Sequence, residues 1–119
     1  MEYSSNLKKF GTGVSPVEIE ETLAAVHRAL PKNRNEKVYK RCFGAIDLTS
    51  LNSTDSKDRI DRFVTRAVEL PNHYPEVPNV ASVCVYPVFV ETAGMAIGDS
   101  GMSITSVCGG FPSSQTYLE

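Results

Sequence analysis

Apolar residues recur at helical spacing after Ser15, where the first element is predicted to begin. Ser15 and Glu18 have the capping-box spacing, and Pro16 occupies the first helical position. Pro31 is expected to end the helix. Its apolar stripe consists of Ile19, Leu23, Val26 and Leu30. The spacing therefore predicts a surface helix that covers something apolar.

Three short apolar runs predict β-strands. They lie at residues 41–48 (RCFGAIDL), 80–86 (VASVCVY) and 102–108 (MSITSVC). The first run does not alternate cleanly between apolar and polar positions, which is typical of a buried parallel strand. Residues 32–40, ahead of the first run, are interpreted as a charged connector.

Helical patterns separate these strands. A helix is predicted to begin at Asp55 or Ser56, and its apolar stripe is Ile60, Phe63, Val64, Ala67 and Val68. A loop follows, marked by Pro71, Pro75 and Pro78. A weaker helix is expected over residues 88–97, ending in a turn at 98–101, and residues 115–119 are expected to form the first turn of another.

The order of elements is α, then β-α-β-α-β, then the start of a helix. Strands that alternate with helices predict right-handed crossovers and a parallel sheet, so the fold class is α/β. Residues 1–14 are interpreted as a flexible, polar lead-in, and residues 15–119 as the folded region.

Composition and charge favour a globular protein over a nucleic-acid-binding or membrane-spanning one. The chain has 119 residues, a formal net charge of −2, 41% hydrophobic residues and 22% charged residues, as in one ordinary globular domain. A slightly acidic chain has no electrostatic reason to bind nucleic acid. No apolar run approaches the roughly 20 residues of a membrane-spanning helix. The start of the chain lacks the order of a signal peptide, so a soluble, cytoplasmic protein is expected.

The cysteines and histidines give no pattern for a metal site. Cys42, Cys84 and Cys108 form no C-x-x-C pair, and each lies in an apolar run where a thiol is expected to fill the core as a small apolar residue, with Cys84 as the exception considered below. His27 and His73 have no Cys, Asp or His at ligand spacing. No metal is predicted.

In parallel α/β folds the functional residues gather where strands end. The three expected strand ends offer Asp47 and Thr49, then Cys84 and Tyr86, then Cys108 with two glycines. An acid within an apolar strand needs a hydrogen-bonded or charged partner, or else its pKa rises. Asp47 is therefore the most informative position, with the alternative that it only caps the following loop.

The two glycines after the third strand, Gly109 and Gly110, allow two interpretations. Their backbone amides could approach an anion ahead of a helix. The spacing matches no established phosphate-binding motif, so a tight turn that needs positive φ is favoured.

Three separated motifs carry a family resemblance. They are AIDLTSL at residues 45–51, VASVCVYP at 80–87 and GFPSSQT at 110–116. In this order they resemble the N-terminal part of deoxyribose-phosphate aldolase, over about residues 15–119, most closely the bacterial branch with an extra leading helix. The resemblance implies a partial TIM (β/α)8 barrel, with a leading helix and about three of the eight βα units.

The resemblance also implies an activity. These enzymes are class I aldolases that cleave 2-deoxyribose 5-phosphate to glyceraldehyde 3-phosphate and acetaldehyde through a lysine Schiff base, with no metal or cofactor. By resemblance, Asp47 joins the polar network around a pair of lysines, Thr49 supplies a nearby hydroxyl and Cys84 lines the substrate pocket. The expected partner is a phosphorylated sugar substrate, and the full-length parent is a candidate homo-oligomer.

The family's lysines lie on later strands, which this chain does not contain. Its own lysines are Lys8, Lys9, Lys32, Lys37, Lys40 and Lys57, and none lies at the carboxyl end of a predicted strand. The chain alone is therefore predicted to be inactive. Its sheet, with unpaired edges and an uncovered face, is expected to expose apolar surface and to associate.

Three interpretations stay open. The chain is part of an aldolase, or one subunit of a split barrel, or a small non-enzymatic α/β module.

Overall fold

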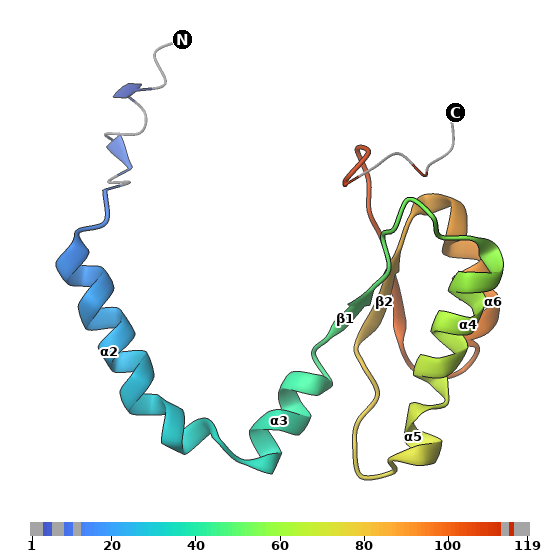
Figure 1. The fold of residues 1–119 in the computed structure, drawn as a ribbon, viewed down its shortest axis with the longest axis horizontal. Helices are drawn as coiled ribbons and strands as arrows, with labels where there is room; N and C mark the ends of the chain where they lie inside the picture. Colours follow the sequence, from blue (N-terminus) through green and yellow to red (C-terminus); the bar gives the residue numbers. More distant parts are fainter. Residues whose placement is uncertain (1–3, 6–8, 11–12, 113–114, 116–119) are drawn as a thin grey trace. The chain divides into compact units, whose positions relative to one another are not determined.

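The computed structural model describes residues 4–5, 9–10, 13–112 and 115 (Figure 1). The chain divides into two compact units, Met1–Asn35 and Glu36–Glu119. The sequence pattern did not predict a division at this point. The flexibility of residues 1–14 stays a prediction, and the helical turn expected at 115–119 lies outside the described residues apart from Gln115.

In the first unit, helix α2 spans Pro16–Asn33 and begins as predicted. The Glu18 amide donates to Ser15 Oγ at 3.1 Å, and the Ser15 amide donates to Glu18 Oε2 at 2.9 Å, which completes the capping box. The predicted end at Pro31 is wrong, because the helix continues for two residues beyond it. A proline so near the C-terminus costs only one backbone hydrogen bond. The Arg34 amide still closes the last turn on the Leu30 carbonyl at 3.1 Å.

The second unit opens with helix α3, Glu36–Phe43, where the sequence predicted a connector and the start of a strand. Lys40 Nζ lies 2.6 Å from Glu36 Oε1, one helical turn away, and this hydrogen bond and charge lower the pKa of Glu36. Cys42 and Phe43 therefore belong to a helix. The first strand is only the end of the predicted run.

Three parallel strands form the sheet in the order β1-β2-β3. They are β1 (Asp47–Thr49), β2 (Ser82–Val85) and β3 (Ser103–Ser106). Asp47 pairs with Ser82 and Thr49 with Cys84, and the register places Ser82 beside Ser103. The predicted parallel α/β arrangement is confirmed, with strands shorter than the apolar runs that predicted them.

Two helices connect the strands and cover one face of the sheet (Figure 1). Helix α4 (Lys57–Val68) begins at Ser56, whose Oγ accepts from the Arg59 amide at 3.3 Å. A short α5 (Leu70–His73) follows, and the 3₁₀ turn η1 (Pro87–Phe89) leads into α6 (Val90–Ile97). Helices α4 and α6 pack against each other.

The core lies between these helices and the sheet. From α4 it receives Ile60, Val64 and Ala67, three of the five positions of the predicted stripe. The strands and α6 contribute Val83, Val85, Ala93 and Ile97. Burial of this apolar surface is the main stabilising contribution to the second unit.

The cysteines do not share one environment. Cys84 is buried, but Cys42 on α3 and Cys108 after β3 are exposed, so the prediction that each fills the core is wrong for those two. Both errors follow from strands that are shorter than the apolar runs. None of the described helices is both long and apolar enough to cross a membrane.

Candidate functional site

One face of the sheet is polar, and it brings together the three residues singled out from the sequence. Neighbours in register point to the same side of a sheet, and so do residues two apart on a strand. This polar face therefore consists of Asp47, Thr49, Ser82, Cys84, Ser103 and Thr105. In the described part of residues 36–119, no helix lies over it (Figure 1). The uncovered face is therefore polar at these positions, and the apolar surface that the sheet exposes lies beside the outer edge of β1 instead. The expected association stays a prediction.

Asp47 finds the hydrogen-bonding partner that the sequence required of it. Ser82 Oγ, 35 residues away along the chain, donates to Asp47 Oδ1 at 2.5 Å. Asp47 is the first residue of β1 and is exposed, so its predicted position at the strand's carboxyl end is wrong. Because the strand begins six residues later than the apolar run, Thr49 occupies that end instead.

Thr49 and Cys84 lie side by side on β1 and β2. The Cys84 side chain is only 5% exposed, whereas Thr49 is exposed and donates from Oγ1 to the Asp47 carbonyl at 3.0 Å. Burial raises the pKa of the Cys84 thiol and the negative charge of Asp47 raises it further, while the Thr49 side chain acts in the opposite direction. The thiol is therefore protonated at neutral pH and lines this face as a neutral group.

A buried carboxylate organises the loop that follows β1. Asp55 is 7% exposed, and its Oδ2 accepts from Ser50 Oγ at 2.8 Å and from the Asn52 amide at 3.0 Å. Its Oδ1 accepts from Asn52 Nδ2 at 3.3 Å and lies 3.6 Å from Arg59 Nε. These contacts fix the loop that follows Thr49, at the carboxyl edge of the sheet.

Two further side chains tie this loop to the other strand ends. Tyr86, which follows β2 and is 1% exposed, donates from its hydroxyl to the Leu51 carbonyl at 2.9 Å. Gln115 Nε2, beyond β3, donates to the carbonyls of Asn52 at 3.0 Å and Ser53 at 2.7 Å. The loops after all three strands are therefore linked at one edge.

The two glycines after β3 adopt the conformation of a tight turn. Gly109 has φ 68° and Gly110 has φ 73°, values that favour glycine. The favoured interpretation of this pair is confirmed. The Phe111 amide bonds back to the Cys108 carbonyl at 3.4 Å, which closes the turn.

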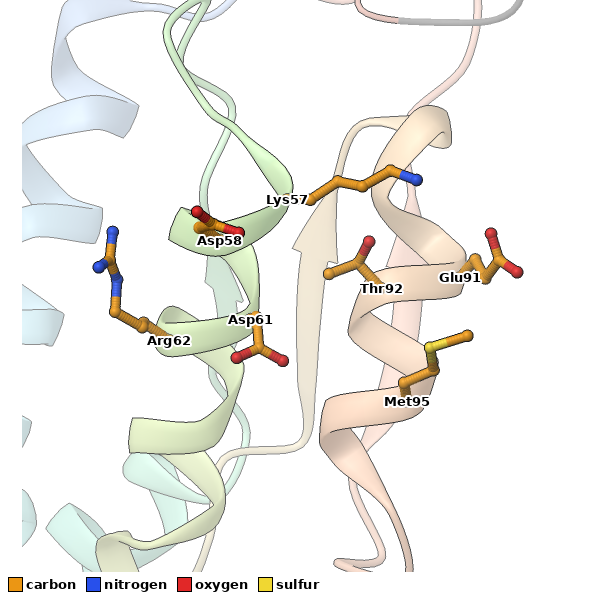
Figure 2. Close-up of a pocket in the computed structure, with 7 residues that line it drawn as sticks. All are labelled: Lys57, Asp58, Asp61, Arg62, Glu91, Thr92 and Met95. Carbon is orange, nitrogen blue, oxygen red and sulfur yellow. The ribbon is translucent and has the colours of Figure 1, made fainter.

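A hollow lies away from the polar face, between the outer surfaces of α4 and α6 (Figure 2). Its volume is about 600 Å³, and it is lined by Lys57, Asp58, Asp61, Arg62, Glu91, Thr92 and Met95. Figure 2 shows these side chains spread along two helices rather than directed at one point. Charges of both signs on exposed helix surfaces are ordinary, so this groove is not the candidate site.

Neither a metal cluster nor a lysine accompanies the polar face. Among the described residues, no group of three His, Cys, Asp or Glu side chains could hold a metal ion. The strands, with sequences DLT, SVCV and SITS, contain no lysine. Lys40 lies on α3, paired with Glu36, and Lys57 lies on α4 at the outer groove.

The sequence patterns did not indicate the contacts of three residues that shape this site: Ser82, Asp55 and Gln115. Ser82 could be found only with the strand register, because it is an ordinary small residue in an apolar run. Asp55 gave a local signal, since an acid directly before a serine N-cap and three residues after Asn52 is typical of a structured loop. Gln115 lies in the third quoted motif, but nothing local indicates its contact with a loop more than 60 residues earlier.

Comparisons with known proteins agree with the resemblance. The chain is 30% identical over 116 residues to a Caenorhabditis elegans protein described as "Putative deoxyribose-phosphate aldolase". The match covers 94% of this chain, and the chain spans 37% of the length of that curated relative. No protein-family model and no solved structure matches the chain.

Proposed function

We propose that this chain forms the N-terminal part of a (β/α)8 barrel of the deoxyribose-phosphate aldolase type. The complete barrel would cleave 2-deoxyribose 5-phosphate to glyceraldehyde 3-phosphate and acetaldehyde through a lysine Schiff base. The observation that carries the proposal is the convergence of Asp47, Thr49 and Cys84 on one polar face of a parallel sheet. The similarity to the Caenorhabditis elegans protein supports it.

Barrel closure would turn this face toward the interior. Thr49 would then lie at the carboxyl end of β1, where active-site residues of such folds gather, with Asp47 two residues before it in the same strand. Asp47, held by Ser82, would then be a fixed anion in the polar network around the Schiff-base lysine. Thr49 and the neutral thiol of Cys84 would line the pocket for the phosphorylated sugar. The proposal includes a cytoplasmic location and a homo-oligomeric parent, and it requires no metal or cofactor.

The isolated chain is proposed to be inactive because its strands carry no lysine. Incubation of the chain with 2-deoxyribose 5-phosphate and borohydride tests this directly. Intact-mass spectrometry should find no covalent adduct. An adduct on this chain alone would contradict the proposal.

A chimera tests the site itself. Residues 1–119 would replace the matched segment of the Caenorhabditis elegans protein, which is 37% of its length, and the rest of that protein would be kept. The folded chimera should release acetaldehyde from 2-deoxyribose 5-phosphate. Asp47→Asn should reduce kcat/KM about 10²-fold, because misplacement of one group in an active site has effects of that order.

Asp58→Asn is the matched control, since Asp58 lies on the outer groove of α4 and should leave the rate unchanged. Circular dichroism and gel filtration would establish that both variants fold. A folded but inactive chimera, or an Asp47 variant with full activity, would favour a non-enzymatic α/β module. Activity restored by mixing the two halves as separate polypeptides would instead favour a split barrel.

A further inference from the structure

Three side chains of the polar face form a row across the sheet near the carboxyl ends of the strands. The register pairs Thr49 with Cys84 and Cys84 with Thr105, so the three lie side by side on one face. Thr49 is the last residue of β1, and Cys84 and Thr105 are each the second-last residue of their strand. Ser103 lies two residues before Thr105, away from the edge where active-site residues gather. Thr105 therefore completes this carboxyl row on the third strand.

The hydroxyl of Thr105 can bind a ligand. Ser82 Oγ donates to Asp47 Oδ1 at 2.5 Å, and Thr49 Oγ1 donates to the Asp47 carbonyl at 3.0 Å. The Thr105 side chain, in contrast, forms no hydrogen bond with any other residue that the structure describes. A threonine hydroxyl offers one donor and two acceptor lone pairs, whereas the neighbouring Cys84 thiol is neutral and only a weak donor. Thr105 is therefore the stronger hydrogen-bonding group of this adjacent pair.

Thr105 is the member of the carboxyl row that lies farthest from Asp47. Neighbouring strands lie about 4.8 Å apart, so two spacings of about 9.6 Å in total separate Thr105 from β1, which carries Asp47. In the proposed reaction Asp47 belongs to the network around the Schiff-base lysine, which acts on the first three carbons of the sugar. Thr105 should therefore contact a more distant part of the same substrate.

The substrate has a hydroxyl of this kind on C4. In its open-chain form, 2-deoxyribose 5-phosphate carries hydroxyls on C3 and C4. Cleavage breaks the C2–C3 bond, and the C3 hydroxyl loses its proton and becomes the carbonyl of glyceraldehyde 3-phosphate. The electron pair of the broken bond passes to C2, which takes up a proton and becomes the methyl group of acetaldehyde. The C4 hydroxyl is unchanged, so it needs a neutral hydrogen-bonding partner rather than a base, and a threonine hydroxyl is such a partner.

We propose that Thr105 is a specificity-determining residue whose hydroxyl binds the C4 hydroxyl of the sugar phosphate. This inference rests on the proposed aldolase function and extends it, because it names the residue that distinguishes a substrate with a hydroxyl at C4 from one with hydrogen there. Loss of one neutral hydrogen bond of this kind corresponds to about a tenfold decrease in kcat/KM.

The chimera tests the proposal with two substrates, 2-deoxyribose 5-phosphate and its 4-deoxy analogue, which both release acetaldehyde on cleavage. Thr105→Val removes the hydroxyl and keeps a β-branched side chain that suits a strand. It should lower kcat/KM about tenfold for 2-deoxyribose 5-phosphate and leave that for the 4-deoxy analogue unchanged. Thr105→Ala should give the same loss of preference. Thr105→Ser keeps the hydroxyl and should retain most of the preference.

Thr92→Val is the matched control, since Thr92 lines the outer groove between α4 and α6 and its replacement should leave both rates unchanged. Circular dichroism would establish that the variants fold. An active chimera in which Thr105→Val changes neither rate, or lowers both equally, overturns this inference and leaves the proposed function standing. A folded chimera with no activity toward 2-deoxyribose 5-phosphate overturns the proposed function and this inference with it.

Discussion

Successive residues of the three short strands point alternately to two faces of the sheet, one apolar and one polar. Leu48, Val83 and Val85 turn toward α4 and α6, and the last two are fully buried. Their neighbours Asp47, Ser82 and Cys84 turn toward the polar face and make side-chain contacts from strand to strand. The covered face therefore stabilises the unit, whereas the polar face contributes little to its core.

The largest expected effect comes from placing a charge on the covered face. Val85→Asp would bury an unpaired carboxylate between β2 and the helices, and should cost more than about 4 kcal/mol in the free energy of unfolding. Urea denaturation followed by circular dichroism measures it. Thr105→Asp, on the exposed face, is the control and should cost less than about 1 kcal/mol. Equal losses at the two positions would contradict the distinction between the faces.

At the edge where the two faces meet, Asp55→Ala should have an intermediate effect. It removes the acceptor of the Ser50 hydroxyl and the Asn52 amide, and should cost about 2 kcal/mol, the typical penalty of leaving such groups unsatisfied. Denaturation would be compared with that of Asp58→Ala, an exposed acid on the same helix start. If the two variants were equally stable, the buried network would be unimportant to folding.

A smaller effect is expected on the polar face. Ser82→Ala removes one hydrogen bond to Asp47 and should cost about 0.5–1 kcal/mol, since the site is exposed to solvent. In the active chimera the same change should lower kcat/KM, because Asp47 loses its orientation. Ser103→Ala, on the same face, makes no bond with Asp47 and serves as the comparison. A loss above about 2 kcal/mol would show that the polar face is structural.

The smallest effect is a pH dependence from Cys84. Because burial, and then the charge of Asp47, raise the pKa of the folded thiol, the unfolded chain loses this proton first. Stability should therefore hold at neutral pH and decrease as pH rises above the ordinary thiol value of about 8.5. Denaturation at several pH values, with Cys42 and Cys108 changed to serine, measures the slope. Cys84→Ala should remove this slope, and a slope that survives would belong to other groups.

The covered face was largely predictable from sequence, because its pattern is local. The stripe on α4 and the Ser56 cap lie within consecutive turns of one helix, and three buried positions follow from periodicity alone. The strand boundaries were harder to predict from the sequence. Residues 41–43 continue an apolar run, yet the Glu36–Lys40 pair and the helix it supports extend over them.

The polar face required information that no single segment contains. Asp47, Thr49 and Cys84 were singled out at the predicted strand ends and given roles by resemblance, and the register then placed them on one face. Ser82 became visible only as the strand partner of Asp47, because it lies among apolar residues in VASVCVY. Contacts that depend on register or on distant loops have no local periodicity, so sequence patterns do not indicate them.

The two hydrogen bonds of Gln115 have a consequence for the order of folding. Its side chain reaches the loop at Asn52 and Ser53 across 63 and 62 residues respectively, after the chain has passed through both crossovers. Closing so long a loop is entropically costly unless intervening contacts already hold its ends close. The Gln115 side-chain amide should therefore become ordered only once β1, β2 and β3 are paired. Its NMR signal would then report when the sheet is complete.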